Sequence, residues 1–392
     1  MKELILNKNE ERRILAGHLW IYSNEINTKL SPLKNFLPGE LVTIETASNR
    51  KLGLGYINPH TLLCARLLTK NCNATIDTNF FIKRLKVALA WREKIFAKPF
   101  YRLIYAESDG LPGLIIDRYA DVLVVQITTA GMENLKAEII EALVATIKPR
   151  SILWRNDNAI RRTEGLDNYV STAYGPEVAS IDLEENSLHF SAAILQGQKT
   201  GWFYDQRNNR LRLRDYVKNA RVLDVFSYTG SFAINAAFAG ACEVIAIDSS
   251  EFALKQVKVN AEINKLATSI HTICDDAFIA LSNLLNSQEK FAVIVLDPPA
   301  FIKRQKDFAQ GFKAYLRLHN MALRLLEQHG ILFTTSCSQH LSRDKLLDII
   351  RQAGLECKRK LSIVEQLHQA QDHPIHPAIT ETEYLKGFIV RS

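Results

Sequence analysis

The residues best suited to chemistry are acids that end short apolar runs in the second half of the chain. Asp224 lies in the first such run, and Asp248 ends the next one. An acid at the end of the second strand of an α/β unit can accept hydrogen bonds from both hydroxyl groups of a ribose. The pair therefore predicts a nucleoside-like ligand. The alternative for Asp248 is that it only caps the helix that follows.

The turn after Asp224 indicates which nucleoside-like ligand fits. A dinucleotide needs a glycine-rich loop so that its pyrophosphate reaches a helix N-terminus, and Phe226, Tyr228 and Phe232 would crowd it. Gly230 still permits one close approach of the backbone to a ligand. An adenosyl ligand that has no phosphate and carries a cationic sulfonium tolerates the aromatic residues and favours a nearby acid. The loop therefore favours S-adenosylmethionine over NAD.

Asp276 follows the third apolar run and has two possible roles. Its carboxylate could accept a hydrogen bond from the exocyclic amine of adenine. It could equally cap the helix that begins at Ala277. The sequence leaves both alternatives open.

The fourth apolar run ends in Asp297-Pro298-Pro299-Ala300-Phe301. Two consecutive prolines make a rigid turn, which would fix the carboxylate of Asp297 in the cleft. The ring of Phe301 can stack on a planar base that has been flipped out of its helix. This sequence after a buried strand is typical of enzymes that methylate planar nitrogen or base substrates.

Cys337 follows the fifth apolar run. A cysteine is most often a small core residue, but at a strand end beside a cleft its thiolate can be a nucleophile. C5 of a pyrimidine accepts a methyl group only after such activation: attack of Cys337 on C6 would make C5 an enamine carbon. Asp297 would then bind the N3/N4 edge of cytosine. The residues leave nucleophile and buried thiol as alternatives, and they do not identify the base that removes the C5 proton.

A polar segment over residues 197–214 precedes the first of these strands and contains Lys199, Arg207 and Arg210. Its glycine and polar residues predict a loop and helix lying over the cofactor cleft. The basic side chains could contact RNA phosphates. They could also form a solvated helix face.

The elements that must position these residues alternate in type after about residue 196. Each apolar run is followed by a stretch with helical spacing, which predicts a parallel α/β sheet with both faces covered and its ligand at the carboxyl ends of the strands. The expected strands are 222–226, 244–248, 270–274, 291–297 and 330–336.

The first half of the chain has a different pattern. Residues 1–70 contain short strand-like runs bounded by turn residues, with 10 Lys/Arg against 6 Asp/Glu, which predicts a small, basic β-barrel-like module. Helical spacing over 77–96 and 133–147, with strand-like runs between and after them, predicts a central α+β region. The expected domains are 1–72, 73–195 and 196–392.

Composition sets broad limits. A chain of 392 residues suggests two or three domains, and a net charge of +7 weakly favours an anionic partner such as nucleic acid. The six cysteines have no zinc-site spacing, so we expect free thiols in a reducing compartment and no metal. No apolar run approaches the roughly 20 residues that cross a bilayer, and no secretory signal is apparent. We therefore expect a cytoplasmic protein without a membrane partner.

Taken together, these motifs resemble the ribosomal RNA large subunit methyltransferase I family, whose members are PUA-domain-containing cytosine-C5 methyltransferases. The resemblance covers essentially the whole chain, and its most specific part is the block from Gly197-Gln198-Lys199-Thr200-Gly201 to Asp205-Gln206-Arg207. Its other parts are Gly17-His18-x-Trp20, Leu223-Asp224-Val225-Phe226-Ser227-Tyr228-Thr229-Gly230, Asp297-Pro298-Pro299, Ser336-Cys337-Ser338, Asp372-His373-Pro374 and Tyr384-Leu385-Lys386-Gly387-Phe388.

The resemblance implies an N-terminal PUA domain, a central α+β domain and a C-terminal Rossmann-like methyltransferase domain. It also implies S-adenosylmethionine as cofactor, 23S ribosomal RNA as substrate and Cys337 as nucleophile beside Asp297, and it leaves a homodimer open. The candidate cofactor residues are Asp224, Ser227, Tyr228, Gly230, Asp248, Ser249, Asp276 and Asp297. The candidate RNA residues are Pro298, Pro299, Phe301, Lys199, Arg207 and Arg210.

Two other functions remain open from the sequence. Asp297-Pro298-Pro299 followed by an aromatic residue also suits methylation of a nitrogen of adenine or guanine in RNA, which needs no thiol. A basic N-terminal module also suits an RNA-binding assembly factor whose cofactor site is vestigial. Substitution of Cys337 by serine should abolish C5 methylation but hardly affect methylation of a nitrogen. Binding of S-adenosylmethionine distinguishes a methyltransferase from an assembly factor with a vestigial site.

Overall fold

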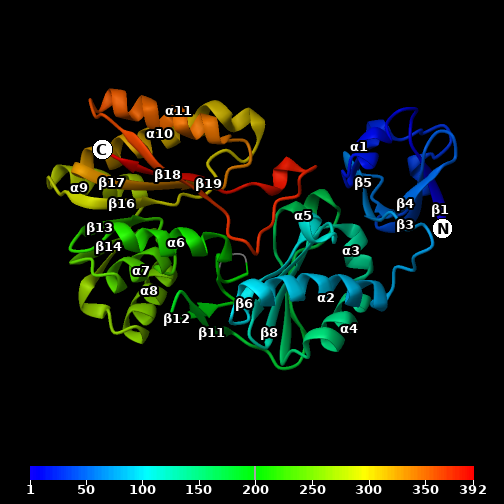
Figure 1. Ribbon diagram of the computed structural model, residues 1–392, viewed down its shortest axis with the longest axis horizontal. Helices are drawn as coiled ribbons and strands as arrows, with labels where there is room; N and C mark the ends of the chain where they lie inside the picture. Colours follow the sequence, from blue (N-terminus) through cyan, green and yellow to red (C-terminus); the bar gives the residue numbers. More distant parts are fainter. Residues whose placement is uncertain (198–199) are drawn as a thin grey trace. The chain divides into compact units, whose positions relative to one another are not determined.

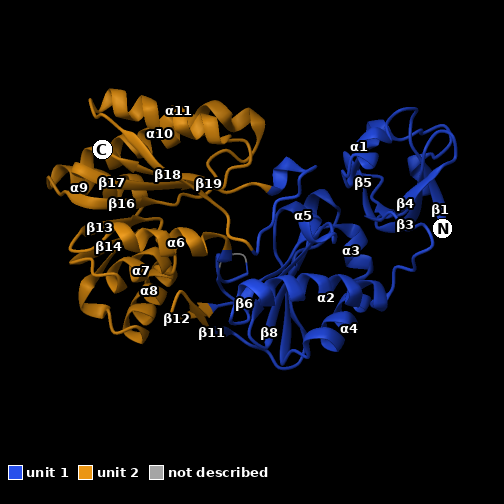
Figure 2. Ribbon diagram, viewed as in Figure 1, with its two compact units in different colours: residues 1–181, 193–204, 372–382 blue, residues 182–192, 205–371, 383–392 orange. Residues whose placement is uncertain are grey.

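The computed structural model describes residues 1–197 and 200–392, and the chain forms two compact units (Figure 2). Both units are built from segments that are distant in sequence. Unit 1 contains Met1–Ile181, Ala193–Tyr204 and Asp372–Thr382. Unit 2 contains Asp182–Ala192, Asp205–Gln371 and Glu383–Ser392.

Unit 1 begins with a five-stranded sheet in the order β1-β3-β4-β5-β2, in which only β1 and β3 pair in parallel. Its inward side chains, among them Leu4, Val42 and Ile44, are fully buried in one apolar core. The predicted small β module is therefore confirmed. Its strands are β1 (Lys2–Ile5), β2 (Trp20–Tyr22), β3 (Glu40–Glu45), β4 (Lys51–Ile57) and β5 (Leu63–Thr69), with the short helix α1 (Arg12–Leu15).

The second sheet of unit 1 has the order β10-β9-β8-β7-β6, and α2 and α4 lie side by side against it (Figure 1). Asp77 starts α2 by accepting a hydrogen bond from Phe80 N at 2.9 Å. The helix expected over 133–147 is divided at Leu135. The elements are α2 (Thr78–Ile95), β6 (Phe100–Tyr105), β7 (Leu114–Tyr119), β8 (Val122–Ile127), α3 (Ala130–Asn134), α4 (Lys136–Ile147), β9 (Ser151–Asn156), α5 (Ile160–Thr163) and β10 (Tyr169–Tyr174).

Unit 2 contains a seven-stranded sheet in the order β15-β14-β13-β16-β17-β19-β18. The five predicted strands are present and parallel, which confirms the predicted α/β sheet. Two further strands extend it, and β19 is antiparallel to both β17 and β18. The strands are β13 (Arg221–Val225), β14 (Glu243–Asp248), β15 (Ile270–Cys274), β16 (Phe291–Leu296), β17 (Leu326–Ser336), β18 (Ser362–His368) and β19 (Lys386–Arg391).

Helices cover both faces of this sheet. Leu223 and Val225 of β13 belong to one buried core and Val222 to another, as the alternation of side chains along a strand requires. The first core includes α9 (Ala277–Asn286), α10 (Phe308–Leu325) and α11 (Arg343–Glu356), and the second includes α6 (Arg207–Leu213), α7 (Ser231–Phe238) and α8 (Glu251–Ile263). The order of β13 to β17 reverses between β13 and β16, and such a switch point is where open α/β sheets bind ligands.

The remaining elements are short. The strands β11 (Ser180–Glu185) and β12 (Leu188–Ala193) form a two-stranded sheet. Across the ranges 1–197 and 200–392, no helix combines the length and the apolar character that crossing a membrane requires. The 3₁₀ helices are η1 (Ser23–Glu25), η2 (Leu33–Asn35), η3 (Ala106–Asp109), η4 (Tyr204–Gln206), η5 (Arg214–Tyr216), η6 (Ala267–Ser269), η7 (Gln305–Asp307) and η8 (Thr380–Thr382).

Candidate active site

The loop between β13 and α7 has an unusual backbone. Phe226 and Tyr228 have φ values of 65° and 49°, and Gly230, the N-cap of α7, has a φ of 78°. Residues other than glycine rarely adopt positive φ, and such positions concentrate at functional sites. A Cβ atom on Gly230 would lie 2.9 Å from Cγ1 of Val257, so this glycine lets α8 pack closely against the loop, and its close approach to a ligand stays a prediction.

Three buried polar atoms on this segment have no hydrogen-bond partner among the described residues. They are Oδ1 of Asp224, Oγ of Ser227 and Oγ1 of Thr229. The other oxygen of Asp224 accepts from Ala233 N at 3.0 Å. Buried polar groups in folded proteins nearly always have a partner, so three unpaired atoms on one loop require an explanation. A ligand that presents ammonium and hydroxyl groups, as S-adenosylmethionine does, would satisfy them.

The carboxyl group of Asp224 is also electrostatically unusual. Asp224 is only 1% exposed. Burial raises the pKa of its carboxyl group to about 8, and the nearby carboxylates of Asp297 and Asp248 contribute to this shift. Low dielectric and like charges both disfavour the ionised form of an acid. A cationic ligand would reverse this effect. The three predicted acids therefore influence one another at the carboxyl ends of β13, β14 and β16.

Asp248 joins the ends of two loops. Its carboxylate accepts from Tyr228 N at 2.9 Å and from Ser250 N at 2.9 Å. The N-cap of α8 is Ser250, whose hydroxyl accepts from Ala253 N, so Asp248 is not the cap of that helix. Ser249 lies exposed between them. The capping alternative for Asp248 is therefore wrong, and its ribose contact stays a prediction.

Asp276 does cap its helix. One carboxylate oxygen accepts from Phe278 N at 2.9 Å and from Ile279 N at 3.3 Å. Asp275 N donates to the carbonyl oxygen of Asp248 at 3.2 Å, which keeps this turn beside the end of β14. The helix-capping role is observed, and the adenine contact of the remaining oxygen stays a prediction.

Asp297 is held from two sides. Its Oδ1 accepts from Gln206 Nε2 at 2.9 Å and from Thr335 Oγ1 at 2.5 Å. Asn209 Nδ2 donates to Oε1 of Gln206 at 2.6 Å and so fixes the orientation of that amide. The beginning of α6 therefore lies at the end of β16, where the polar segment was expected. The sequence did not identify Gln206 or Thr335 as neighbours of this acid.

Cys337 directly follows β17 and is half-buried. The hydroxyl groups of Ser336 and Ser338 each lie 2.9 Å from the phenol oxygen of Tyr315, which fixes the cysteine from both sides. Thr335 lies two residues earlier, and residues two apart point to the same side of an extended chain. The structure therefore brings Cys337 to the rim that carries Asp297, while the roles of both residues stay predictions.

The two prolines after Asp297 differ in exposure, and the aromatic residue that follows them packs in a cluster of rings. Pro298 is buried and Pro299 is exposed. The ring of Phe301 packs at 4.8 Å from Tyr315 and at 6.2 Å from both Phe226 and Phe278. Because this cluster holds the ring on three sides, its stacking on a base stays a prediction.

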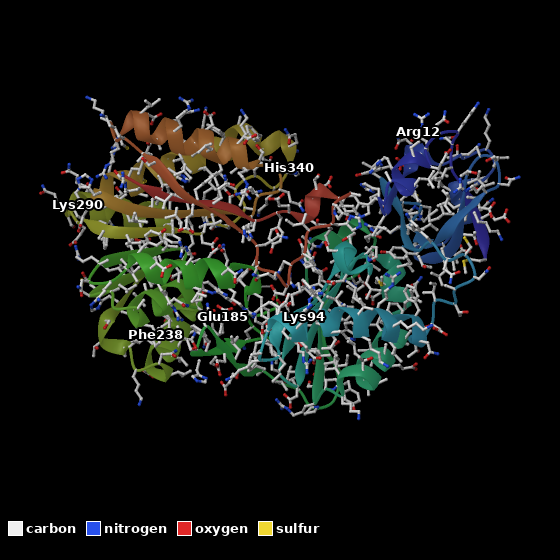
Figure 3. The ribbon with its side chains drawn as sticks, viewed as in Figure 1. Arg12, Lys94, Glu185, Phe238, Lys290 and His340 are labelled. Atoms are coloured by element: carbon white, nitrogen blue, oxygen red, sulfur yellow. The ribbon has the colours of Figure 1, made fainter. Side chains whose placement is uncertain are left out.

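Two of the candidate RNA residues are buried and paired with an acid. Arg207 and Arg210 are buried rather than exposed, and their guanidinium groups pair with Glu185 (labelled in Figure 3). The Nε–Oε1 distance is 2.6 Å for Arg210, and the Nε–Oε2 distance is 3.4 Å for Arg207. If a phosphate took the place of Glu185 beside these arginines, the buried carboxylate of Glu185 would lose its cationic partners, which is costly. This burial rules out a solvated helix face for the two arginines and disfavours their contact with phosphates, which stays a prediction. Lys199 lies outside the described residues.

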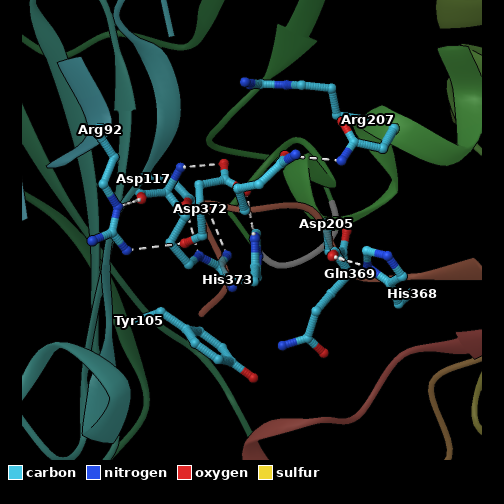
Figure 4. A network of polar contacts seen from close by, with 12 residues as sticks. Arg92, Tyr105, Asp117, Asp205, Arg207, His368, Gln369, Asp372 and His373 are labelled. Atoms are coloured by element: carbon cyan, nitrogen blue, oxygen red, sulfur yellow. Dashed lines mark hydrogen bonds and ion pairs between the residues drawn. The ribbon is translucent and has the colours of Figure 1, made fainter. Parts of the chain in front are cut away.

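A buried polar network in unit 1 involves Asp372 and His373 (Figure 4). Oδ1 of Asp372 lies 2.9 Å from His373 Nδ1, and its Oδ2 accepts from Arg102 N at 2.9 Å. Arg92 Nη2 donates to the carbonyl oxygen of Asp372 at 3.0 Å and also pairs with Asp109. This late segment is therefore anchored within unit 1.

Comparison with known proteins gives a consistent result. A family described as S-adenosylmethionine-dependent methyltransferase matches residues 159–391, and a PUA-like domain family matches residues 4–70. The chain is 36% identical to ribosomal RNA large subunit methyltransferase I of Enterobacter sp. (strain 638), over 99% of this chain and 98% of that protein. It is 37% identical to the protein of the same description from Escherichia coli (strain K12), with the same coverage. A SAM-dependent methyltransferase structure from Streptococcus mutans matches over 100% of both chains with a TM-score of 0.85 and 20% identity.

Proposed function

Because this chain belongs to the ribosomal RNA large subunit methyltransferase I family, we propose that it methylates C5 of a cytosine in 23S ribosomal RNA through a covalent adduct of Cys337. It is an S-adenosylmethionine-dependent RNA methyltransferase with a Rossmann-like catalytic sheet and an N-terminal PUA-like domain. The observation that carries the proposal is that Asp297 and Cys337 directly follow the adjacent parallel strands β16 and β17, and that the hydroxyl of Thr335 on β17 donates to Asp297.

The cofactor would be held by the residues at the ends of β13, β14 and β15. Oδ1 of Asp224 and the hydroxyl groups of Ser227 and Thr229 would bind its polar groups, since these atoms are otherwise unpaired. Asp248 would accept from the ribose hydroxyls, and Asp276 from the adenine amine. S-adenosylmethionine supplies the electrophilic methyl group when bound. Tyr228, Gly230, Ser249 and Asp297 complete the proposed cofactor set.

The chain's own residues would activate the base. The Cys337 thiolate forms a bond to C6, and the electron pair of the C5=C6 bond makes C5 nucleophilic. Asp297 binds the N3/N4 edge of the cytosine and opposes its rotation. After C5 is methylated, a base takes the C5 proton, the C5=C6 bond forms again and the sulfur leaves as thiolate.

The RNA would also contact the N-terminal domain. Residues 1–70 carry 10 Lys/Arg against 6 Asp/Glu, and such an excess supports sequence-independent contacts with phosphates. We propose that residues 1–72 bind RNA, that 73–195 form the central domain, and that 196–392 carry the methyl transfer.

Nucleoside mass spectrometry of ribosomal RNA tests this function. Cells that lack the protein should lose one 5-methylcytidine, and the wild-type gene should restore it. Cys337→Ser should not restore it, because a hydroxyl is a far weaker nucleophile than a thiolate. Cys242→Ser, which changes an exposed cysteine in the same sheet domain, is the matched control and should restore it fully.

Two results would contradict the proposal. Full restoration by Cys337→Ser, or loss of a nitrogen-methylated purine instead of 5-methylcytidine, would favour the nitrogen-directed alternative. Failure of the purified protein to bind S-adenosylmethionine at millimolar concentration in a calorimetric titration would favour the assembly factor.

A further inference from the structure

We propose that Lys386 activates Cys337, by accepting the thiol proton and then stabilising the thiolate as an ammonium group. This inference rests on the proposed function of Cys337 as nucleophile. Lys386 would act through the cysteine, which itself reacts with the base, and it need not touch the RNA. It lies on β19, the strand that the sequence did not predict.

The path of the lysine side chain carries the inference. In the antiparallel pair of β17 and β19, Lys386 lies opposite Ser336. Its Nζ donates to the carbonyl oxygen of Ser338 at 2.7 Å. The side chain therefore starts beside the residue before Cys337 and ends on the residue after it, so the ammonium group lies next to the cysteine.

The ammonium group forms no ion pair with a carboxylate of residues 1–197 or 200–392. Lys386 is 6% exposed and takes part in no ion pair among the residues that the structure describes. Glu383 and Arg343 act on Lys386 with opposite signs, and they pair with each other at 3.2 Å, so these two charges largely compensate each other. Burial lowers the pKa of Lys386 to about 8, while its interaction with Cys337 opposes that shift. A lysine with such a pKa can exchange a proton with a thiol near neutral pH.

The other titratable groups packed against this turn are poor bases for the thiol. Burial raises the pKa of Tyr315, and its hydroxyl is shared between Ser336 and Ser338. His319 lies with its two ring nitrogens 2.7 Å from Tyr315 O and 2.9 Å from Thr334 Oγ1, and burial lowers its pKa to about 4. Of Lys386, Tyr315 and His319, Lys386 is therefore the suitable proton acceptor for the thiol.

The proposed proton transfer is balanced at each end of the cycle. The neutral amine of Lys386 accepts the proton of the Cys337 thiol, which gives an ammonium group and a thiolate. The thiolate then forms its bond to C6. When the C5 proton goes to a separate base, the bond between sulfur and C6 breaks and the thiolate returns beside the ammonium group, which stabilises it as a leaving group.

Alkylation of Cys337 by iodoacetamide tests the inference without methylation. Its rate is measured from pH 5 to pH 10 in the full-length protein, with the Cys337 peptide resolved by mass spectrometry. Lys386→Met should raise the midpoint of the pH profile by about one unit or more, and the rate at pH 7 should fall about threefold or more, since lower thiolate content is partly offset by higher nucleophilicity. Lys386→Arg, which keeps the charge, should retain a low midpoint.

Two variants separate activation from a structural role. Lys345→Met removes an exposed lysine from α11 and should leave the profile unchanged. Lys386→Gln keeps a donor for the carbonyl oxygen of Ser338 and should still raise the midpoint, so it replaces Lys386→Met if that variant does not fold. A profile of Lys386→Met or Lys386→Gln that superimposes on the wild type overturns the inference.

The outcome also separates this inference from the proposed function. If Cys337→Ser abolishes methylation while Lys386→Gln leaves the alkylation profile and kcat unchanged, the cysteine is the nucleophile and the lysine is structural. If Lys386→Gln raises the midpoint while Cys337→Ser still methylates RNA, the lysine ionises the thiol as inferred, and the proposed covalent function is the part that fails.

Discussion

Asp224 holds a carboxyl group that ionises only near pH 8, inside a site for a cationic cofactor. A bound sulfonium favours the ionised form, so the affinity for S-adenosylmethionine should increase by up to about tenfold per pH unit from pH 6 to pH 8 and then level off. Asp224→Asn should bind more weakly and lose this dependence. Isothermal titration over this pH range measures both effects.

The matched control for this prediction is a ligand without the sulfonium charge. S-adenosylhomocysteine should show a weaker pH dependence than S-adenosylmethionine in the wild-type protein, because its sulfur is neutral. Equal slopes for the two ligands would mean that the acid does not respond to the sulfonium.

The folded pKa of Asp224 lies above the value in an unfolded chain, so its contribution to stability is present below about pH 4 and is lost as the pH rises through 8.

The sequence predicted the position of some site residues but not of others. Asp224, Asp248 and Asp297 were found because the end of a buried run marks the edge of a parallel sheet, where side chains from distant segments meet. Gln206 and Lys386 belong to motifs of the family resemblance, but the sequence assigned neither a role, because each acts through a partner that only the folded chain supplies.

For Arg207 and Arg210, the sequence suggested a role that the folded chain does not favour. Sequence showed the charges of Arg207 and Arg210 but not their partner, Glu185, which lies on a separate hairpin. A basic cluster is therefore evidence for an RNA contact only where no buried acid in the fold neutralises it.

At the scale of elements, His319 ties α10 to β17. Its Nδ1 faces the carbonyl oxygen of Tyr315 and so carries the proton, which leaves Nε2 to accept from the hydroxyl of Thr334. Burial lowers the pKa of His319 to about 4, below its value in an unfolded chain. The unfolded state therefore binds the extra proton first, and the free energy of unfolding should fall by about 3 kcal/mol between pH 6.5 and pH 4 because of this one group.

Urea unfolding at several pH values checks this prediction. His319→Gln should be less stable at pH 7, by about 1–3 kcal/mol, because it alters two buried hydrogen bonds. It should also lose less stability than the wild type on acidification. His340→Gln changes an exposed histidine of unit 2 (Figure 3) and should follow the wild-type curve. An unchanged acid limb in His319→Gln would contradict the argument.

The elements that sequence predicted were those with a local pattern. The strands β13 to β17 have continuous apolar runs, because both of their faces are covered. In β18 only Leu367 is buried, so its residues resemble a surface loop. The run in β19 is short, and its place between β17 and β18 is decided by pairing with residues far along the chain.

At the scale of the whole molecule, Asp372 lies within unit 1 although all of the preceding 167 residues, 205–371, belong to unit 2. Asp372→Ala would leave His373 and the buried amide of Arg102 without this carboxylate. We expect unit 1 to lose about 2–4 kcal/mol of unfolding free energy, since a buried group that loses its partner keeps its desolvation cost.

Tryptophan fluorescence is a selective measurement for this prediction. All four tryptophans, Trp20, Trp91, Trp154 and Trp202, belong to unit 1. The urea midpoint from fluorescence should therefore decrease in Asp372→Ala. Asp348→Ala, which breaks an exposed ion pair on α11, should leave it unchanged. An unchanged fluorescence midpoint in Asp372→Ala would show that the segment does not stabilise unit 1.

The interleaving of the two units was beyond sequence analysis. Periodicity identifies a strand or a helix, but it does not say which body that element joins. The three linear domains expected from composition, 1–72, 73–195 and 196–392, stay a proposal. The compact units instead exchange the segments 182–192, 193–204 and 372–382 along the chain.

This exchange has a consequence for biosynthesis. A ribosome makes the chain from its N-terminus, so the nascent protein lacks Asp372–Thr382 of unit 1 and all of β19 long after most of both units has been synthesised. Until then β17 has an open edge, which is a site for misplaced strand pairing. Neither unit can reach its final form before residues 372–392 have left the exit tunnel.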